Sequence, residues 1–130
     1  MQALLFITLC RWAGIPARWQ SGWKAEPGFC GAHDWAQFYV APYGWLYADP
    51  SFGGGAFREH NEGRRLHYFG NLDPYRMVAN TQFQGDFDVP KGHWRADPYD
   101  NQVGEMETAD RGLCYDEFER SKEVLEYTQL

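Results

Sequence analysis

The chain has 130 residues, which fits one domain and leaves no room for two independent cores. Its 18% aromatic content argues against disorder, and a net charge of −6 without a basic stripe argues against a nucleic-acid partner. The negative charge is concentrated in residues 97–130, which we interpret as a solvated acidic face.

The chain opens with an apolar run, Met1 to Cys10, that ends at Arg11. A transmembrane span would need about 20 apolar residues. A secretory or lipoprotein signal would need a basic residue ahead of the run and a small residue before the cleavage point, where Leu9 stands. The pattern favours a helix that is apolar on every face and buried in a core, ended by Gly14 and without an N-cap residue at its start.

Four strands are expected after this helix. Residues 17–23, 33–40 and 45–49 have strand-like alternation, and the turn at 42–44 makes a hairpin of the last two. Residues 24–32 are predicted as a loop between the first two strands, and residues 50–65 as a mobile loop after the third. The remainder is predicted as a turn region at 69–75, a short strand at 76–82 and an irregular stretch at 83–112, while periodicity alone does not separate strand from helix at 113–130, where strand then helix is one interpretation. The fold class is therefore α+β, in a single domain spanning residues 1–130.

The hairpin brings His33 and Asp49 to one edge of the predicted sheet. Alternation places His33, Trp35 and Asp49 on one face, a few residues out of step, so that a bulge or a splayed strand end must absorb the offset. An aspartate that binds one imidazole nitrogen leaves the other free to take a proton from a nucleophile. Taken alone the pair is a weak signal, because an ordinary hydrogen bond at a sheet edge explains it equally well. Trp23 and Trp35 are candidates for the wall of a substrate groove.

The run "LFITLCRWAGIPARWQSGW … HDWAQFYVAPYGWLYADPSFG" resembles the second half of a transglutaminase-like domain, from the superfamily that shares the papain-like cysteine-protease core. The resemblance covers about residues 1–52. It implies that a buried helix packs on an antiparallel sheet, that His33 acts as general base, and that Asp49 orients it. The motif elements that match are Gly14 to Arg18, His33, Trp35, Gly44-Trp45 and Asp49-Pro50.

In the superfamily pattern the nucleophilic cysteine opens the helix, which would place it about two residues before Met1. Together with the missing N-cap, this predicts an N-terminally truncated domain, with a pseudoenzyme as the alternative. Residues 1–52 would carry the core helix and the His/Asp hairpin, and residues 53–130 a C-terminal β-rich region. We expect the chain alone to be inactive.

The resemblance implies a cysteine acyl-transfer enzyme that acts on a peptide or protein amide, with hydrolysis favoured over crosslinking. It suggests an exported bacterial protein, periplasmic or extracellular, and implies no cofactor and no metal. The alternative is a non-catalytic module on the same fold that binds a peptide or a glycan through surface aromatic side chains.

The remaining cysteines and histidines have simpler interpretations. Cys10 is predicted to lie in the core. Cys30 is a loop thiol, or alternatively a substitute nucleophile or, with His33, half of a metal site that no second pair completes. The sequence does not exclude one disulfide bond between two of the three cysteines. The other assignments are Cys114 with no role, His60 and His67 in solvent, and His93 packed beside Trp94 or hydrogen-bonded locally.

Overall fold

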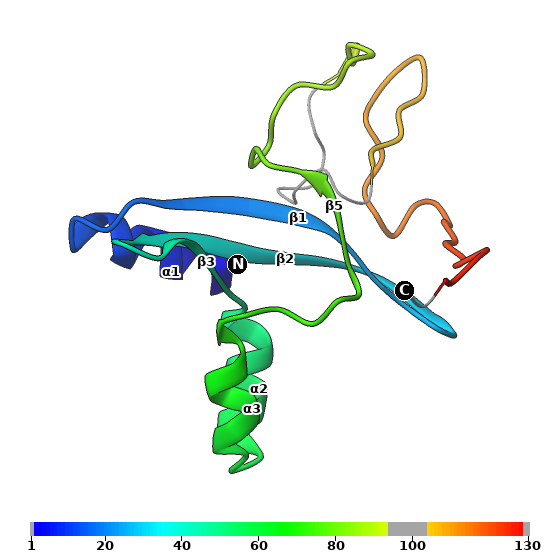
Figure 1. Cartoon of the computed structure of the whole chain (residues 1–130). Coiled ribbons are helices and arrows are strands. Elements are labelled where there is room, and N and C mark those ends of the chain that lie inside the picture. The colour runs from blue at the N-terminus through cyan, green and yellow to red at the C-terminus, as the bar shows by residue number, and fades with distance from the viewer. Residues whose placement is uncertain (1, 94–103, 129–130) are drawn as a thin grey trace.

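A computed structural model describes residues 2–93 and 104–128 (Figure 1). Five strands form one sheet in the order β4-β3-β2-β1-β5, and all neighbours are antiparallel. The helices and this antiparallel sheet confirm the α+β class. The elements are α1 (Gln2–Trp12), β1 (Ala17–Glu26), β2 (Phe29–Val40), β3 (Gly44–Ala48), α2 (Pro50–Arg58), α3 (Glu62–His67), β4 (Phe69–Gly70) and β5 (Arg76–Asn80).

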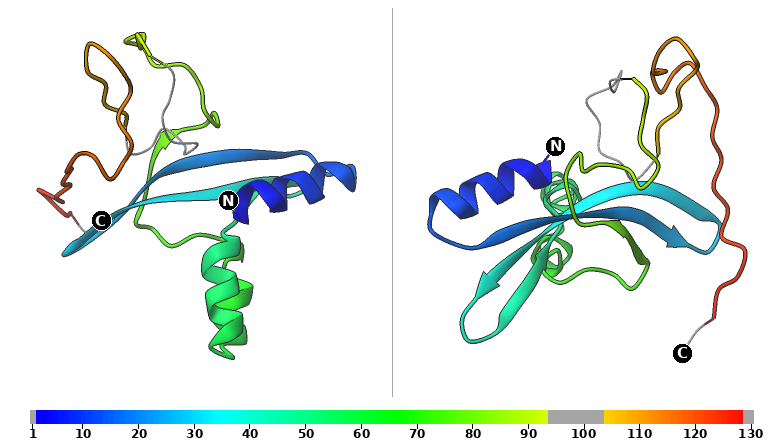
Figure 2. Two further views of the ribbon diagram at one scale, coloured as in Figure 1. Left: turned by 180° about the vertical axis from the view of Figure 1, so that it is seen from behind. Right: turned by 90° about the horizontal axis from the view of Figure 1, so that it is seen from above.

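Helix α1 runs along the sheet and covers part of one face (Figure 2). The side chains at helical spacing that face the sheet are buried, and Gly14 ends the helix with a φ of +79°, as predicted. Burial on every face, however, is wrong. Leu5 is 62% exposed and Trp12 is 86% exposed, because the described elements pack against one side of the helix only.

The core lies between α1 and the sheet. Strand alternation points one set of side chains toward the helix, where Trp19 and Phe38 meet Ile7. Cys10 belongs to this core, as predicted. The full set of core residues is Ala3, Ile7, Cys10, Ala17, Trp19, Ala36, Phe38 and Ala48.

Strands β1 and β2 form a longer hairpin than the sequence predicts. Pairing continues from Ala17 opposite Phe38 to Glu26 opposite Phe29, so the predicted loop at residues 24–32 is wrong. Pro27 and Gly28 alone make the turn, and Gly28 takes a φ of +79° that favours glycine. A tight turn of this kind lets both flanking segments stay in the sheet.

The predicted mobile loop at residues 50–65 is also wrong, because it forms the helices α2 and α3, which lie side by side below the sheet in Figure 1. Asp49 caps α2 and is followed by Pro50, and Asn61 caps α3 by accepting a hydrogen bond from Arg64 N–H. The three consecutive glycines of α2 hide its helical pattern, since glycine costs about 1 kcal/mol relative to alanine in a helix.

Strand β5 confirms the short strand predicted from Arg76, and it pairs with β1 at the sheet edge. Its register shifts between Ser21 and Gly22. The two chains approach so closely there that a Cβ on Gly22 would lie 1.9 Å from the Met77 carbonyl oxygen. Only glycine fits that point.

The later part of the chain is irregular. The predicted turn region at 69–75 begins with the two-residue strand β4. Among residues 81–93 and 104–128, only an isolated bridge pairs Glu107 with Gly112. The strand and helix predicted at 113–130 are therefore wrong over the described residues, and residues 129–130 lie outside them. No helix in the described part of the chain is both long enough and apolar enough to cross a membrane.

Candidate functional site

His33 and Asp49 are in direct contact. His33 Nε2 lies 2.7 Å from Asp49 Oδ2, the Asp49 side chain is fully buried, and the His33 side chain is 19% exposed. The pairing of β2 with β3 ends at Ala36 and Ala48, so Asp49 leaves the sheet beside Trp35 and reaches diagonally to His33. Of the two solutions expected from the sequence, the splayed strand end absorbs the offset.

The Asp49 carboxylate binds His33 through Oδ2 and caps helix α2 through Oδ1. Its Oδ1 accepts hydrogen bonds from Ser51 N at 3.2 Å, from Ser51 Oγ at 2.7 Å and from Phe52 N at 3.0 Å, which caps α2. Burial alone would raise the pKa of Asp49. The hydrogen bond and charge of His33, and then the Phe52 N–H and the Ser51 hydroxyl, hold that pKa below its usual range.

These contacts determine which nitrogen of His33 carries the proton. An ionised Asp49 can only accept, so His33 Nε2 must donate to it. Ser51 Oγ lies 3.3 Å from the same nitrogen, but its hydroxyl proton goes to Asp49 Oδ1. Within the described residues no hydrogen bond to His33 Nδ1 is found. The network therefore assigns Nδ1 as the nitrogen with a free lone pair.

Two aromatic rings hold the imidazole in this orientation. The Phe52 ring centroid lies 4.8 Å from that of His33, and the Trp35 ring stacks at 6.5 Å. Trp35 has no exposed surface, and its indole N–H donates to Gln20 Oε1 at 2.9 Å. A direct contact between Trp35 and a substrate would require a neighbouring side chain to move, so its substrate-binding role stays a prediction.

A buried arginine from β5 joins the pair. Arg76 Nη1 lies 3.0 Å from Asp49 Oδ2, while Arg76 Nη2 and Nε lie 2.8 and 3.1 Å from Asp73 Oδ2. Burial would raise the pKa of Asp73, but the Arg76 hydrogen bond and charge lower it. Sequence reasoning missed Arg76, Asp73 and Ser51. An Asp-Pro-Ser cap pattern could have indicated Ser51, whereas Arg76 arrives only through the pairing of β5 with β1.

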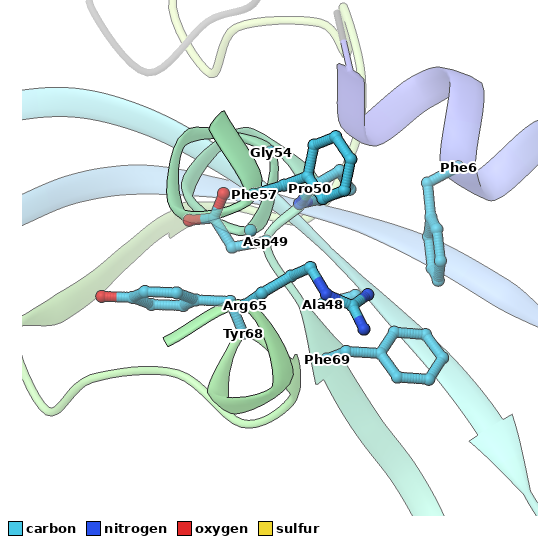
Figure 3. A pocket seen from close by; sticks show the side chains of 10 residues that line it. Phe6, Ala48, Asp49, Pro50, Gly54, Phe57, Arg65, Tyr68 and Phe69 are labelled. Carbon is cyan, nitrogen blue, oxygen red and sulfur yellow. The ribbon is translucent and has the colours of Figure 1, made fainter. Parts of the chain in front are cut away.

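Two cavities adjoin this cluster. One, of about 350 Å³, lies on the His33 face of the sheet, with Gln20, Tyr47, Asn71 and Arg76 among its lining residues. The other, of about 320 Å³, lies between α1, α2 and α3, and Figure 3 shows Phe6 pointing in from α1 and Arg65 from α3. The Arg65 guanidinium is already paired with Glu62. The first cavity lies on the sheet face that carries His33, which makes it the better candidate for a substrate site.

The start of α1 lies level with His33 along the sheet. Helix α1 is about 16 Å long at 1.5 Å per residue, and five residues along a strand cover about the same length at about 3.3 Å per residue. Five steps from Ala17 reach Gly22, the register partner of His33. Gln2 Oε1 lies 3.9 Å from the Cβ position of Gly54 in α2, so this helix end abuts the helix that Asp49 caps. Alternation nevertheless places α1 on the face of Trp19 and Ala36, opposite the face that carries the His33 side chain.

Other predicted site residues are not brought to His33. Alternation places Trp23 and Cys30 on the opposite face of the sheet, which removes the support for Cys30 as a substitute nucleophile. Its predicted place in a loop is also wrong, since it lies in β2. The substrate-binding role of Trp23 stays a prediction. Burial raises the pKa of the Cys10 thiol, as expected for a core residue.

The other cysteine and histidine predictions are resolved as follows. Cys10, Cys30 and Cys114 form no disulfide with one another. Among the described residues no three histidine, cysteine or acidic side chains are arranged to hold a metal ion. His60 and His67 are exposed, as predicted. His93 Nε2 lies 3.0 Å from the oxygen of Ala109, sixteen residues away, so this contact is not the local hydrogen bond that was predicted, and Trp94 lies outside the described residues.

Residues 1–50 match the family model of the transglutaminase-like superfamily. The match covers α1, β1, β2, β3 and Asp49, and it confirms the resemblance over this segment. Comparison with curated proteins and with solved structures gave no match. Ser51, Phe52 and Arg76 lie beyond the matched segment, although they contact residues within it, and Asp73, also beyond it, is linked to the cluster through Arg76.

Proposed function

We propose that this chain carries the proton-handling part of a transglutaminase-like cysteine acyl-transfer site, with His33 as general base and acid and Asp49 as its orienting partner. One observation carries the proposal: a buried, ionised Asp49 binds His33 Nε2 at 2.7 Å and leaves Nδ1 available. The family match over residues 1–50 supports the same chemistry.

The nucleophile in this proposal is a cysteine at the N-terminal end of α1. The resemblance implies a position about two residues before Met1. The start of α1 lies level with His33 along the sheet, but α1 packs on the opposite face, so the residues before Met1 would have to pass round the end of the sheet to reach His33. A thiolate there would be stabilised by the helix dipole. Cys10 is eight residues further along than Gln2, or about 12 Å, and is buried in the core. We therefore expect no amide turnover from residues 1–130 alone, which would form part of a single domain.

The reaction proceeds in two steps. The thiol gives its proton to His33 Nδ1 and attacks the amide carbonyl carbon, the C–N bond breaks, and the imidazolium returns the proton to the leaving amine. His33 then takes a proton from water as the water attacks the thioester carbonyl carbon, the C–S bond breaks, and the imidazolium returns the proton to the leaving thiolate, which gives the carboxylic acid and the free thiol. Asp49 keeps its charge throughout and stabilises the imidazolium.

We propose a peptide or protein amide as substrate and hydrolysis as the outcome. The 350 Å³ cavity beside the cluster supports an extended polar chain, because Gln20, Tyr47 and Asn71 offer hydrogen-bonding groups along it and Trp35 lies at its base. A primary amine that replaced water in the second step would give crosslinking instead, and mass spectrometry of the products distinguishes the two.

The test is a chain extended by its own upstream codons, in a Cys30→Ser, Cys114→Ser background. We expect a cysteine two residues before Met1 and alkylation by iodoacetamide at pH 6, slowed at least about tenfold by His33→Ala. The matched control is the same extension with that cysteine changed to serine. Another residue at this position, or alkylation indifferent to His33, would overturn the proposal and favour the non-catalytic binding module.

A further inference from the structure

The Asp49 carboxylate oxygen that binds His33 also has a cationic neighbour, Arg76. Oδ2 lies 2.7 Å from His33 Nε2 and 3.0 Å from Arg76 Nη1. The charge of Asp49 is therefore shared between the imidazole and a guanidinium that comes from the far edge of the sheet.

The hydrogen bonds that hold the Arg76 side chain in place are made with Asp73 and not with Asp49. Its Nε and Nη2 both bind Asp73 Oδ2, and Asp73 is itself fixed by the Tyr68 hydroxyl at 3.2 Å and the Tyr75 N–H at 3.2 Å. Nη1, by contrast, is a buried nitrogen with no aligned hydrogen-bond partner in the described chain. Arg76 thus acts on Asp49 through its charge at short range.

The surroundings make this charge effective. The Arg76 side chain is 5% exposed, and its guanidinium carbon lies 4.9 Å from the Phe52 ring centre and 5.5 Å from that of Trp35. These are the two rings that also contact His33. Little water separates the charges, so the interaction is stronger than a surface ion pair.

We propose that Arg76 is a positioning residue of the His33–Asp49 pair and that Asp73 sets how strongly it acts. Arg76 keeps the Asp49 carboxylate in line with His33 Nε2 and takes up part of its charge. An imidazolium facing an unshared buried carboxylate would hold its proton too tightly to return it to a leaving group. This role rests on the proposed function, and it places a site residue beyond the segment that matches the family.

Two other cations lie close to the Phe52 ring. Lys24 lies 5.1 Å from its centre and pairs with Glu26 at 3.0 Å, and Arg64 lies 6.0 Å from it and pairs with Glu59 at 2.8 Å. No ion pair links either cation to Asp49 among the described residues. Lys24→Met is therefore a matched control that removes a nearby positive charge without touching the Asp49 carboxylate.

The experiment follows the His33 ring-proton signal by NMR against pH in the unmodified chain and in four variants. In Arg76→Met we expect the midpoint of the His33 titration to move up by about one pH unit, because the imidazolium then faces an unshared carboxylate. In Asp73→Asn it should move down by a smaller amount, because Arg76 loses its counter-charge. Arg76→Lys should restore at least half of the change, and Lys24→Met should leave the midpoint within about 0.2.

A merely structural role would not shift the His33 midpoint in opposite directions in Arg76→Met and Asp73→Asn. If Arg76→Met fails to fold, the double variant Arg76→Met/Asp73→Asn removes one charge of each sign and is expected to raise the midpoint. An unchanged midpoint in a folded Arg76 variant, or a shift of the same sign in the Asp73 variant, would overturn the inference. The titration needs no thiol, so it stands even where the upstream residue proves not to be cysteine.

Discussion

Residues 2–80 and the described residues that follow them are stabilised in different ways. All buried hydrophobic residues of the described chain lie between Ala3 and Ala56, where helices pack on the sheet. Beyond residue 80 the described contacts include polar pairs, such as the ion pairs of Lys91 with Glu105 and of Arg111 with Glu117, and single ring contacts of Phe83 with Trp19 and of Tyr127 with Tyr75. Arg111 and the Cys114 amide lower the pKa of Glu117 to about 2. A chain can thus order a segment without giving it a core, and such contacts add little stability.

The comparison also shows where the candidate site ends. The family match stops at residue 50 and the resemblance at about residue 52, but the contacts of Asp49 extend to Arg76. The region that folds as helices and strands therefore contains the whole cluster, whereas residues 81–93 and 104–128 contribute none of the contacts to His33 or Asp49 described above.

The largest effect is expected from Trp35→Ala, which removes a fully buried ring from the first region. We expect a loss of about 3–5 kcal/mol in the free energy of unfolding, measured by urea denaturation. The matched control is Leu125→Ala in the second region, where the side chain is 89% exposed and the expected change is within about 0.5 kcal/mol. Similar losses in both variants would contradict the comparison.

Asp49→Asn is expected to cost about 3 kcal/mol at pH 7, because it removes a buried charge that contacts His33 and Arg76 while an asparagine still caps α2. The pKa of Asp49 is lowered in the folded chain, so its contribution is present above the unfolded value of about 3.9 and is lost as the pH falls through the folded one. The difference between the denaturation curves of the two proteins should shrink as the pH falls below about 3.9. A constant difference down to pH 2 would show that the charge is not responsible.

A chain that ends after Phe83 tests whether the two regions form one domain. It keeps the contact of Phe83 with Trp19 and loses that of Tyr127 with Tyr75. We expect the same far-ultraviolet circular dichroism per folded residue and a cooperative transition weakened by about 1 kcal/mol. Loss of cooperative unfolding would instead support one indivisible domain over residues 1–130.

The smallest effect is expected from Gly55→Ala in α2. A Cβ there would meet only the end of the Arg58 side chain at 3.9 Å, so the substitution should stabilise the helix by about 0.5–1 kcal/mol. Gly28→Ala is the contrasting variant, since its φ of +79° makes alanine unfavourable. If both variants were destabilising by thermal denaturation, α2 would not be the helix described here.

The sequence predicts the elements whose signals are local. Gly14 ends α1, the Pro42 turn joins β2 to β3, and the hairpin is enough to bring His33 to Asp49. The helix α2 is missed because three glycines lower its propensity while the Asp49 cap and the packing of α3 sustain it. Arg76 is missed for another reason: β5 pairs with β1, more than fifty residues earlier, and no local pattern encodes that pairing.

The apolar composition of α1 gives a further lesson. Every turn of the helix carries large apolar side chains, so periodicity could not tell the covered face from the exposed one. Which face is buried depends on the sheet alone, through Ala3, Ile7 and Cys10.

The close approach of β5 to β1 at Gly22 has a consequence for how mutational data on this chain should be read. Gly22 is the register partner of His33 on one side and of Val78, two residues beyond Arg76, on the other. Any side chain there would push β5 outward and carry the guanidinium away from Asp49. A saturation scan scored on the Arg76–Asp49 ion pair would therefore rank Gly22 with the two members of that pair, although Gly22 has no side chain that could join it. The intolerance of Gly22 to substitution would reflect the short distance between the backbones of β1 and β5.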